Sequence, residues 1–230
     1  QAALWLFIAI VFAAVSHRML PFFSARALPL LDAWRPLWLL WLLVGVLGFE
    51  GLMSLTLATP WPVPPALRWL QVALEAPAAA LLLWLALRWG LLQSVNNRLL
   101  AMLHLSFLWL AIALTLYALS HTLMALGLAS LGRAPLHAMG MGFLGSTLFA
   151  MATRVSAGHS GRPLVADNWV WGLYWLLQAA VLARLLAALW ISASGPLLLG
   201  AVSAWTLAMC AWALRYGNWF GRPRADGRAG

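Results

Sequence analysis

The feature that most constrains this chain is a succession of long apolar runs. A helix needs about 20 apolar residues to cross roughly 30 Å of hydrocarbon. Each run is continuous rather than alternating, which favours helices over barrel strands. The runs cover residues 2–15, 36–57, 66–87, 99–119, 136–153, 169–191 and 196–214, and a further apolar stretch, 122–131, is too short to cross alone. The sequence therefore predicts an all-α fold, a polytopic transmembrane helix bundle with about seven spans.

Composition supports this prediction. Charged residues make up 8% of the 230 residues, and hydrophobic residues make up 64%. A soluble domain carries roughly 25% charged residues, so this chain cannot cover itself with polar surface. A soluble enzyme, a nucleic-acid-binding domain and a disordered scaffold are excluded, and the lipid bilayer is the expected surrounding. The single cysteine, Cys210, excludes a disulfide framework and a multi-thiolate metal site. We interpret it as a small buried residue.

The net charge of +9 reflects 14 arginines, no lysine and five acids. One set of connections between spans holds eleven arginines: Arg18, Arg26, Arg35, Arg88, Arg98, Arg154, Arg162, Arg215, Arg222, Arg224 and Arg228. The alternate set holds two, Arg68 and Arg133. Positive residues mark the cytoplasmic side, so the visible N-terminus is predicted outside and residues 215–230 form a cytoplasmic tail. We expect residues 1–230 to be one transmembrane domain, and Gln1 at the head of an apolar run suggests a piece of a longer protein.

Two further patterns concern packing. Nine of the 16 tryptophans lie near span ends, where an amphipathic ring prefers the interface: Trp34, Trp38, Trp61, Trp69, Trp89, Trp169, Trp171, Trp190 and Trp219. Small residues recur every four positions in the fifth run, at Ala138, Gly142, Ser146 and Ala150. Such a stripe allows close approach of another helix or of a flat cofactor. Of the two, helix contact is favoured.

Three ionisable residues lie inside predicted spans, where charge is costly. Three roles are open for Glu50 and for Glu75: a proton-relay carboxyl, a partner in a ligand site, or a protonated acid bonded to a neighbouring helix. Arg184 keeps its charge and must find an anion or acceptor. Glu50 and Glu75 are both candidate partners for Arg184, and the sequence favours neither.

The five histidines are the strongest chemical indication. The span map places His17, His104 and His159 toward the inner side, and His121 and His137 at the outer side. We interpret His17 and His121 as polar tips near water. An imidazole within hydrocarbon, as expected for His104, favours a metal, a haem iron or a strong hydrogen bond. No His pair at i, i+4 occurs, so a helix-borne zinc motif is not indicated.

Four segments resemble the NnrS family, bacterial membrane proteins associated with the nitric oxide response. The most specific is the stretch 137–164, which begins His-Ala-Met-Gly and ends Gly-His-Ser-Gly-Arg-Pro-Leu. The others are Arg-Met-Leu-Pro-Phe-Phe-Ser at 18–24, Leu103-His104 with the Trp109 region, and the tail at 222–230, where Ala229 stands in place of the family's usual proline. The resemblance covers the C-terminal part of a family with about twelve spans. An early Trp-His-x-His-Glu stretch of the family is missing here.

The resemblance implies haem b and copper in the bacterial cytoplasmic (inner) membrane, and protection against nitric oxide or nitrosative stress. Carried over residue by residue, His104, His137 and His159 are the expected metal ligands. Arg154 and Arg162 are expected partners for a propionate or another anion, because a guanidinium presents a planar fork to carboxylates. His17 stands where the family often has glycine, and His121 matches no family motif. Ligands shared with the missing N-terminal half, or with another membrane subunit, remain open.

Nitric oxide or its metal adducts are the expected ligand, and whether the protein turns nitric oxide over, binds it or protects iron stays open. Three alternatives remain. An electron-transfer subunit like cytochrome b would need two histidines facing each other, and His104 with His137 is disfavoured because they are predicted on opposite sides. A transporter segment without metal would use Glu50, Glu75 and Arg184. The last alternative is a purely structural cluster of spans in a larger complex.

Overall fold

The computed structural model describes residues 1–28, 31–32, 34–56 and 62–228. Within them the chain forms helices and loops and no strand, which confirms the predicted fold class. The elements are η1 (Leu4–Ala9), α1 (Ile10–Ala27), α2 (Leu37–Leu55), α3 (Pro65–Arg88), α4 (Leu91–Ser94), α5 (Arg98–Ala125), α6 (Ala134–His137), η3 (Ala138–Gly145), α7 (Ser146–His159), α8 (Asn168–Leu189), η4 (Ile191–Ala193) and α9 (Ser194–Gly217). The two segments η1 and η3 are π-helical turns that continue directly into α1 and α7.

Six helices in the described part of the chain are long and apolar enough to cross a membrane. A seventh is formed by α6, η3 and α7, which follow one another without a break from residue 134 to residue 159. The predicted number of about seven spans is thus confirmed. Leu57, where the second run was expected to end, and Trp61 in the connection after it lie outside the described residues, as does Ala229.

Several predicted boundaries were wrong, and in each case polar residues were taken for helix ends. The first helix continues past Val15 to Ala27, because Ser16, His17 and Ser24 are buried against the bundle. The fourth continues to Ala125 and the fifth to residue 159. The last helix extends to Gly217, so residues 215–217 belong to α9 rather than to a tail.

The helix ends that do match have local causes. Asn97 caps α5 by accepting a hydrogen bond from the backbone N–H of Leu100 at 3.3 Å. Asp167 caps α8 in the same way, with the N–H of Val170 at 3.0 Å. These side chains satisfy backbone donors that a helix start leaves open. Gly90, at φ +100°, ends α3 in a left-handed conformation that other residues rarely adopt.

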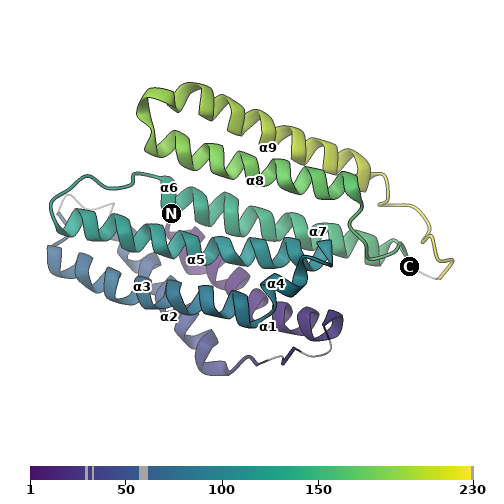
Figure 1. Cartoon of the computed structure of the whole chain (residues 1–230), viewed down its shortest axis with the longest axis horizontal. Coiled ribbons are helices and arrows are strands. Elements are labelled where there is room, and N and C mark those ends of the chain that lie inside the picture. The colour runs from purple at the N-terminus through teal and green to yellow at the C-terminus, as the bar shows by residue number, and fades with distance from the viewer. Residues whose placement is uncertain (29–30, 33, 57–61, 229–230) are drawn as a thin grey trace.

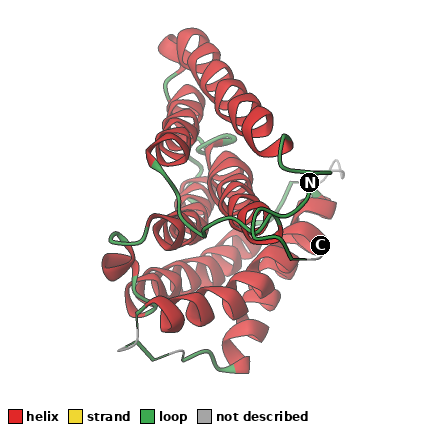
Figure 2. Ribbon diagram, turned by 90° about the vertical axis from the view of Figure 1, so that its right-hand side faces the viewer, coloured by secondary structure: helices red, strands yellow, loops and turns green. Residues whose placement is uncertain are grey.

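The core lies around α5. Of the spans, α5 has the largest buried share, 72% of its most apolar window, against 11% for α9. Helix α3 runs alongside α5 (Figure 1). Helices α8 and α9 form a hairpin, and α7 lies between this hairpin and α5. Figure 2 shows this hairpin projecting from the rest of the bundle. Many large apolar side chains are exposed on the bundle, as expected of a surface in lipid.

Two predictions about individual residues are corrected by this packing. Cys210 is exposed rather than buried, because α9 buries only Ala201, Ala208 and Tyr216 and turns its other faces outward. Trp89, expected as an interfacial anchor, is buried, and its indole N–H donates to the backbone oxygen of Trp34 at 2.9 Å.

The small-residue stripe of the fifth span serves helix contact, as predicted. Gly142 lies directly beneath the indole ring of Trp109 from α5. The indole N–H donates to Oε1 of Gln178 at 2.6 Å, and the amide of Gln178 donates to Oγ of Ser146 at 2.9 Å. The stripe therefore joins this helix to α5 and, through Gln178, to α8.

Replacing Gly142 by alanine is expected to destabilise the protein by about 1–3 kcal/mol, the usual range for overpacking. A Cβ at Gly142 would lie 2.6 Å from the indole ring, so the ring must move and strain its bond to Gln178. Gly140 is the matched control, because it lies on the same helix and a Cβ there meets nothing within 4 Å. Thermal unfolding in detergent should show a lower Tm for Gly142→Ala than for Gly140→Ala. Equal Tm values would contradict the close contact.

Candidate metal centre

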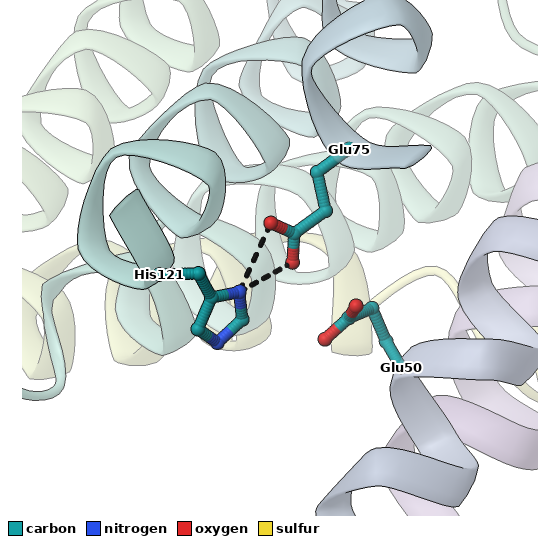
Figure 3. A group of neighbouring side chains, drawn as sticks. All are labelled: Glu50, Glu75 and His121. Atoms are coloured by element: carbon teal, nitrogen blue, oxygen red, sulfur yellow. Dashed lines mark hydrogen bonds and ion pairs between the residues drawn. The ribbon is translucent and has the colours of Figure 1, made fainter. Parts of the chain in front are cut away.

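Three helices bring Glu50, Glu75 and His121 together inside the bundle. Glu50 comes from α2, Glu75 from α3 and His121 from α5, and Figure 3 shows their side chains pointing toward one another. Their exposed fractions are 4%, 0% and 7%. One ligand atom from each lies within 4.8 Å of the others. Among the described residues, this is the group of His and acidic side chains whose spacing suits a metal ion.

The cluster is held by hydrogen bonds from neighbouring helices. The Nδ1–H of His121 donates to Glu75, at 2.9 Å from Oε1 and 3.0 Å from Oε2. The amide nitrogen of Gln71 donates to Glu50, at 3.3 Å from Oε2 and 3.5 Å from Oε1. Arg68 in turn donates to Oε1 of Gln71 at 3.0 Å. The two carboxyl groups thus bond to neighbouring helices, one of the alternatives that the sequence left open.

A small polar cavity adjoins this cluster. Its volume is about 70 Å³, and its lining includes Glu50, His121 and the side chain of Tyr117. The Tyr117 ring lies 5.8 Å from the imidazole of His121 and 5.2 Å from the ring of Trp5, centroid to centroid. A cavity of this size holds more than one water molecule. The arrangement can therefore hold a cation or a proton between the carboxyl groups, with water beside it.

Arg184 is not the partner of either glutamate in the described structure. It lies on α8 beside a cavity lined by Met141 and Trp205. The cation near the two acids is Arg68, which was expected only in a connection between spans. The sequence spacing could have indicated this proximity. Arg68, Gln71 and Glu75 stand at i, i+3 and i+7, which places them on one face of α3.

His121 belongs to the cluster rather than to the interface. It lies one turn before the end of α5 and is buried. Its interpretation as a polar tip near water was therefore wrong, because the helix continues beyond the predicted end at Leu119. His17 is also buried, and its Nε2–H donates to the backbone oxygen of Pro36 at 3.2 Å.

The histidines expected as ligands lie apart from one another. His104 is completely buried in α5; its Nε2 is hydrogen-bonded to Oγ of Ser24 at 2.9 Å, and its Nδ1 has no partner among the described residues. His137 ends α6, and its Nε2 is likewise buried without a described partner. At 1.5 Å per residue, the two lie roughly 25 Å apart along the antiparallel helices. A single metal or haem between them is therefore excluded within this chain.

His159 is exposed at the opposite end of the helix from His137 and borders a cavity of about 350 Å³. Met19, Phe23 and Met151 give this cavity apolar walls. Arg154 also lines it, with its guanidinium 4.0 Å from the ring centroid of Phe23. The cavity thus joins an apolar interior to a cation and an imidazole.

The chain's C-terminal segment docks beside this cavity. The N–H of Ala225 donates to the oxygen of Ser160 at 2.9 Å, and Asp226 packs against Gly161, which has a φ of +68°. The ion pair with Arg224 lowers the pKa of Asp226 to about 2. Arg162 lies over the ring of Trp219 at 4.4 Å, and its NH1 is buried without a described partner.

The NnrS family profile, described as NnrS protein, matches residues 1–224. The chain belongs to the NnrS family. Comparison with curated proteins and comparison with solved structures each gave no match. The NnrS assignment agrees with the membrane-spanning helices, and the buried cluster provides this family member with one group of side chains suited to a metal ion.

Proposed function

We propose that this NnrS-family protein binds haem b and copper in the bacterial inner membrane and protects against nitric oxide or nitrosative stress. Family membership supports a role in the nitric oxide response. The observation that carries the proposal is that two buried imidazole nitrogens, Nδ1 of His104 and Nε2 of His137, have no hydrogen-bond partner in the described part of the chain. Buried polar atoms are nearly always bonded, and an ion is one explanation for an exception.

The residues present fit the two cofactors. If Nε2 of His104 carries the proton and donates it to Ser24, Nδ1 presents a lone pair, which is how a metal-binding imidazole is normally oriented. Copper accepts imidazole nitrogen readily, so His104 and His137 are each proposed to bind copper, at two separate positions in the chain. When bound, a haem iron or copper ion with an open position supplies the site at which nitric oxide can coordinate.

We propose the cavity beside His159 as the place for haem b. The apolar walls suit a macrocycle, and a volume of about 350 Å³ falls within the usual range for ligand pockets. If haem b is held here, His159 would supply an imidazole nitrogen to the iron, and Arg154 would pair with a propionate, because both side chains line the same cavity. Arg162 lies close to the turn that follows His159, and its NH1 has no hydrogen-bond partner among the residues that the structure describes.

The orientation proposed for the chain follows the arginines. The end of the bundle that carries His159 and the docked C-terminal segment is also the end rich in arginine, so we place it in the cytoplasm. We propose that ligands from another membrane subunit complete the coordination that single histidines leave open.

An optical spectrum of the purified protein, with metal analysis, tests the proposal. We expect a Soret band, an α-band after reduction, and copper. Replacing His104, His137 and His159 singly by alanine should remove haem absorbance or copper in at least one variant, and Asn97→Ala at the α5 cap serves as a control that should keep both. A colourless, metal-free preparation would contradict the function. Unchanged cofactor content in all three variants would contradict the ligand assignment.

A further inference from the structure

We infer that Glu50, Glu75 and His121 form a binding site for a divalent cation such as Zn²⁺ or Fe²⁺, separate from the proposed haem and copper sites. The three side chains come from three different helices. They meet beside the C-terminal half of α5, whereas His104 lies in the N-terminal half of that helix. The site therefore goes beyond the proposed function and does not depend on it.

The spacing between His121 and Glu75 already matches two neighbouring ligands of one ion. Metal–nitrogen and metal–oxygen bonds to zinc measure about 2.0–2.2 Å. Two such ligands at a right angle are then about 2.9 Å apart, by the same bond lengths. The structure has Nδ1 of His121 at 2.9 Å and 3.0 Å from the two oxygens of Glu75. An ion can thus take the place of the shared proton without movement at a right angle between the two ligands, and with an increase of about 0.5 Å in their separation at the tetrahedral angle.

Glu50 supplies the third ligand. The three ligand atoms lie within 4.8 Å of one another. Ligands of a tetrahedral zinc ion are about 3.4 Å apart, by its bond lengths, so the carboxylate of Glu50 must approach by no more than about 1.4 Å. Its two hydrogen bonds to Gln71, at 3.3 Å and 3.5 Å, are long and allow this shift.

The charge of the cluster also calls for a cation. Two carboxyl groups lie buried beside a neutral or singly charged imidazole, and unpaired charge in such surroundings is costly. Arg68 does not neutralise either acid directly, because its described hydrogen bond goes to the amide oxygen of Gln71. Without a metal ion, protons must take the place of the cation at the two carboxyl groups.

The adjoining cavity provides the remaining requirements of a metal site. Three protein ligands leave at least one coordination position open, which water normally fills. The cavity of about 70 Å³ is lined by Glu50 and His121 and has room for that water. Ser54 and Gln71 also line it and offer polar contacts to a bound water.

The ligand set indicates the class of ion. Two carboxylates and one imidazole suit a divalent transition-metal cation such as Zn²⁺ or Fe²⁺, and they do not suit Cu(I), which favours thiolate and thioether. Cu²⁺ accepts the same ligands as Zn²⁺, so copper is measured beside zinc and iron in every cluster variant. Mg²⁺ is disfavoured, because it keeps several waters and is held mainly by oxygen. We assign Zn²⁺ or Fe²⁺ to the cluster and the copper to the separate histidines of the proposed function.

The experiment measures metal content and affinity on the full chain purified in detergent. Elemental analysis gives metals per chain. Chelator-treated protein is then titrated with Zn²⁺, and separately with Fe²⁺ under anaerobic conditions, against a chromophoric competitor. We expect one equivalent bound by the original chain, and affinity at least tenfold weaker in Glu50→Gln, Glu75→Gln and His121→Gln. Haem absorbance and copper, measured on the same samples, should not change.

Control variants separate this site from the others. His104→Ala and His137→Ala should keep the Zn²⁺ affinity of the original chain. If a glutamine variant fails to fold, Glu50→Asp keeps the charge while moving the carboxylate, and the Tm of the original chain but not of this variant should rise with added Zn²⁺. Absence of Zn²⁺ and Fe²⁺ binding, equal affinity in all cluster variants, or loss of copper alone in those variants would each overturn the inference.

Discussion

Replacing Trp109 by alanine is expected to lower the free energy of unfolding by about 3–5 kcal/mol, the range for removing a buried tryptophan. The side chain is 8% exposed, its ring covers Gly142, and its N–H donates to Gln178. Alanine removes both the packing and the hydrogen bond. It leaves a cavity between α5 and η3 that the glycine on the other side cannot fill.

Trp109→Phe separates the two contributions. Phenylalanine keeps an aromatic ring over Gly142 but leaves Oε1 of Gln178 without its donor, which costs about 1–3 kcal/mol for a buried group. Denaturant titration in detergent, followed by circular dichroism, should place Trp109→Phe between the original chain and Trp109→Ala. A loss below 1 kcal/mol for Trp109→Ala, or equal losses for both variants, would contradict the packing described.

The sequence allowed the helices to be predicted because apolar runs of membrane length leave few alternatives. It did not allow several of their ends to be predicted, because polar residues stay helical wherever the bundle buries them. Ser24 illustrates the difference: it continues α1 and bonds His104, which is 80 residues away. His121 was misplaced for the same reason, since α5 extends a turn past it.

The individual residues of the candidate centre were also accessible to sequence reasoning, but their partners were not. Glu50 and Glu75 were singled out as costly inside a span, and both are buried. Which cation or imidazole meets them depends on the order and rotation of helices, and the contact between Glu75 and His121 joins residues 46 apart. Arg184 was therefore as reasonable a partner as Arg68. His104, His137 and His159 remain predicted ligands.

Replacing Glu75 alone by leucine is expected to destabilise the metal-free protein by about 3–5 kcal/mol, the range for breaking a buried pair. The substitution removes the acceptor of the His121 Nδ1–H and leaves that donor facing an apolar side chain. His121→Leu should have a comparable effect, because it leaves the fully buried carboxyl group of Glu75 without its donor.

The double variant, Glu75→Leu with His121→Leu, should be destabilised by less than the sum of the single variants, and by no more than the worse of them. Two leucines bury no unpaired polar group, and replacing both partners of a buried pair by apolar residues is often close to neutral. Unfolding in detergent with a chelator present measures the cycle, and the difference from additivity gives the coupling between the two side chains. Additive losses would show that Glu75 and His121 act independently and that their hydrogen bond does not form.

A strong coupling would mean that the pair stabilises the contact between α3 and α5 without a metal ion. A metal ion at the cluster would then add stability to a contact that already exists, and Zn²⁺ should stabilise the original chain without stabilising the double variant.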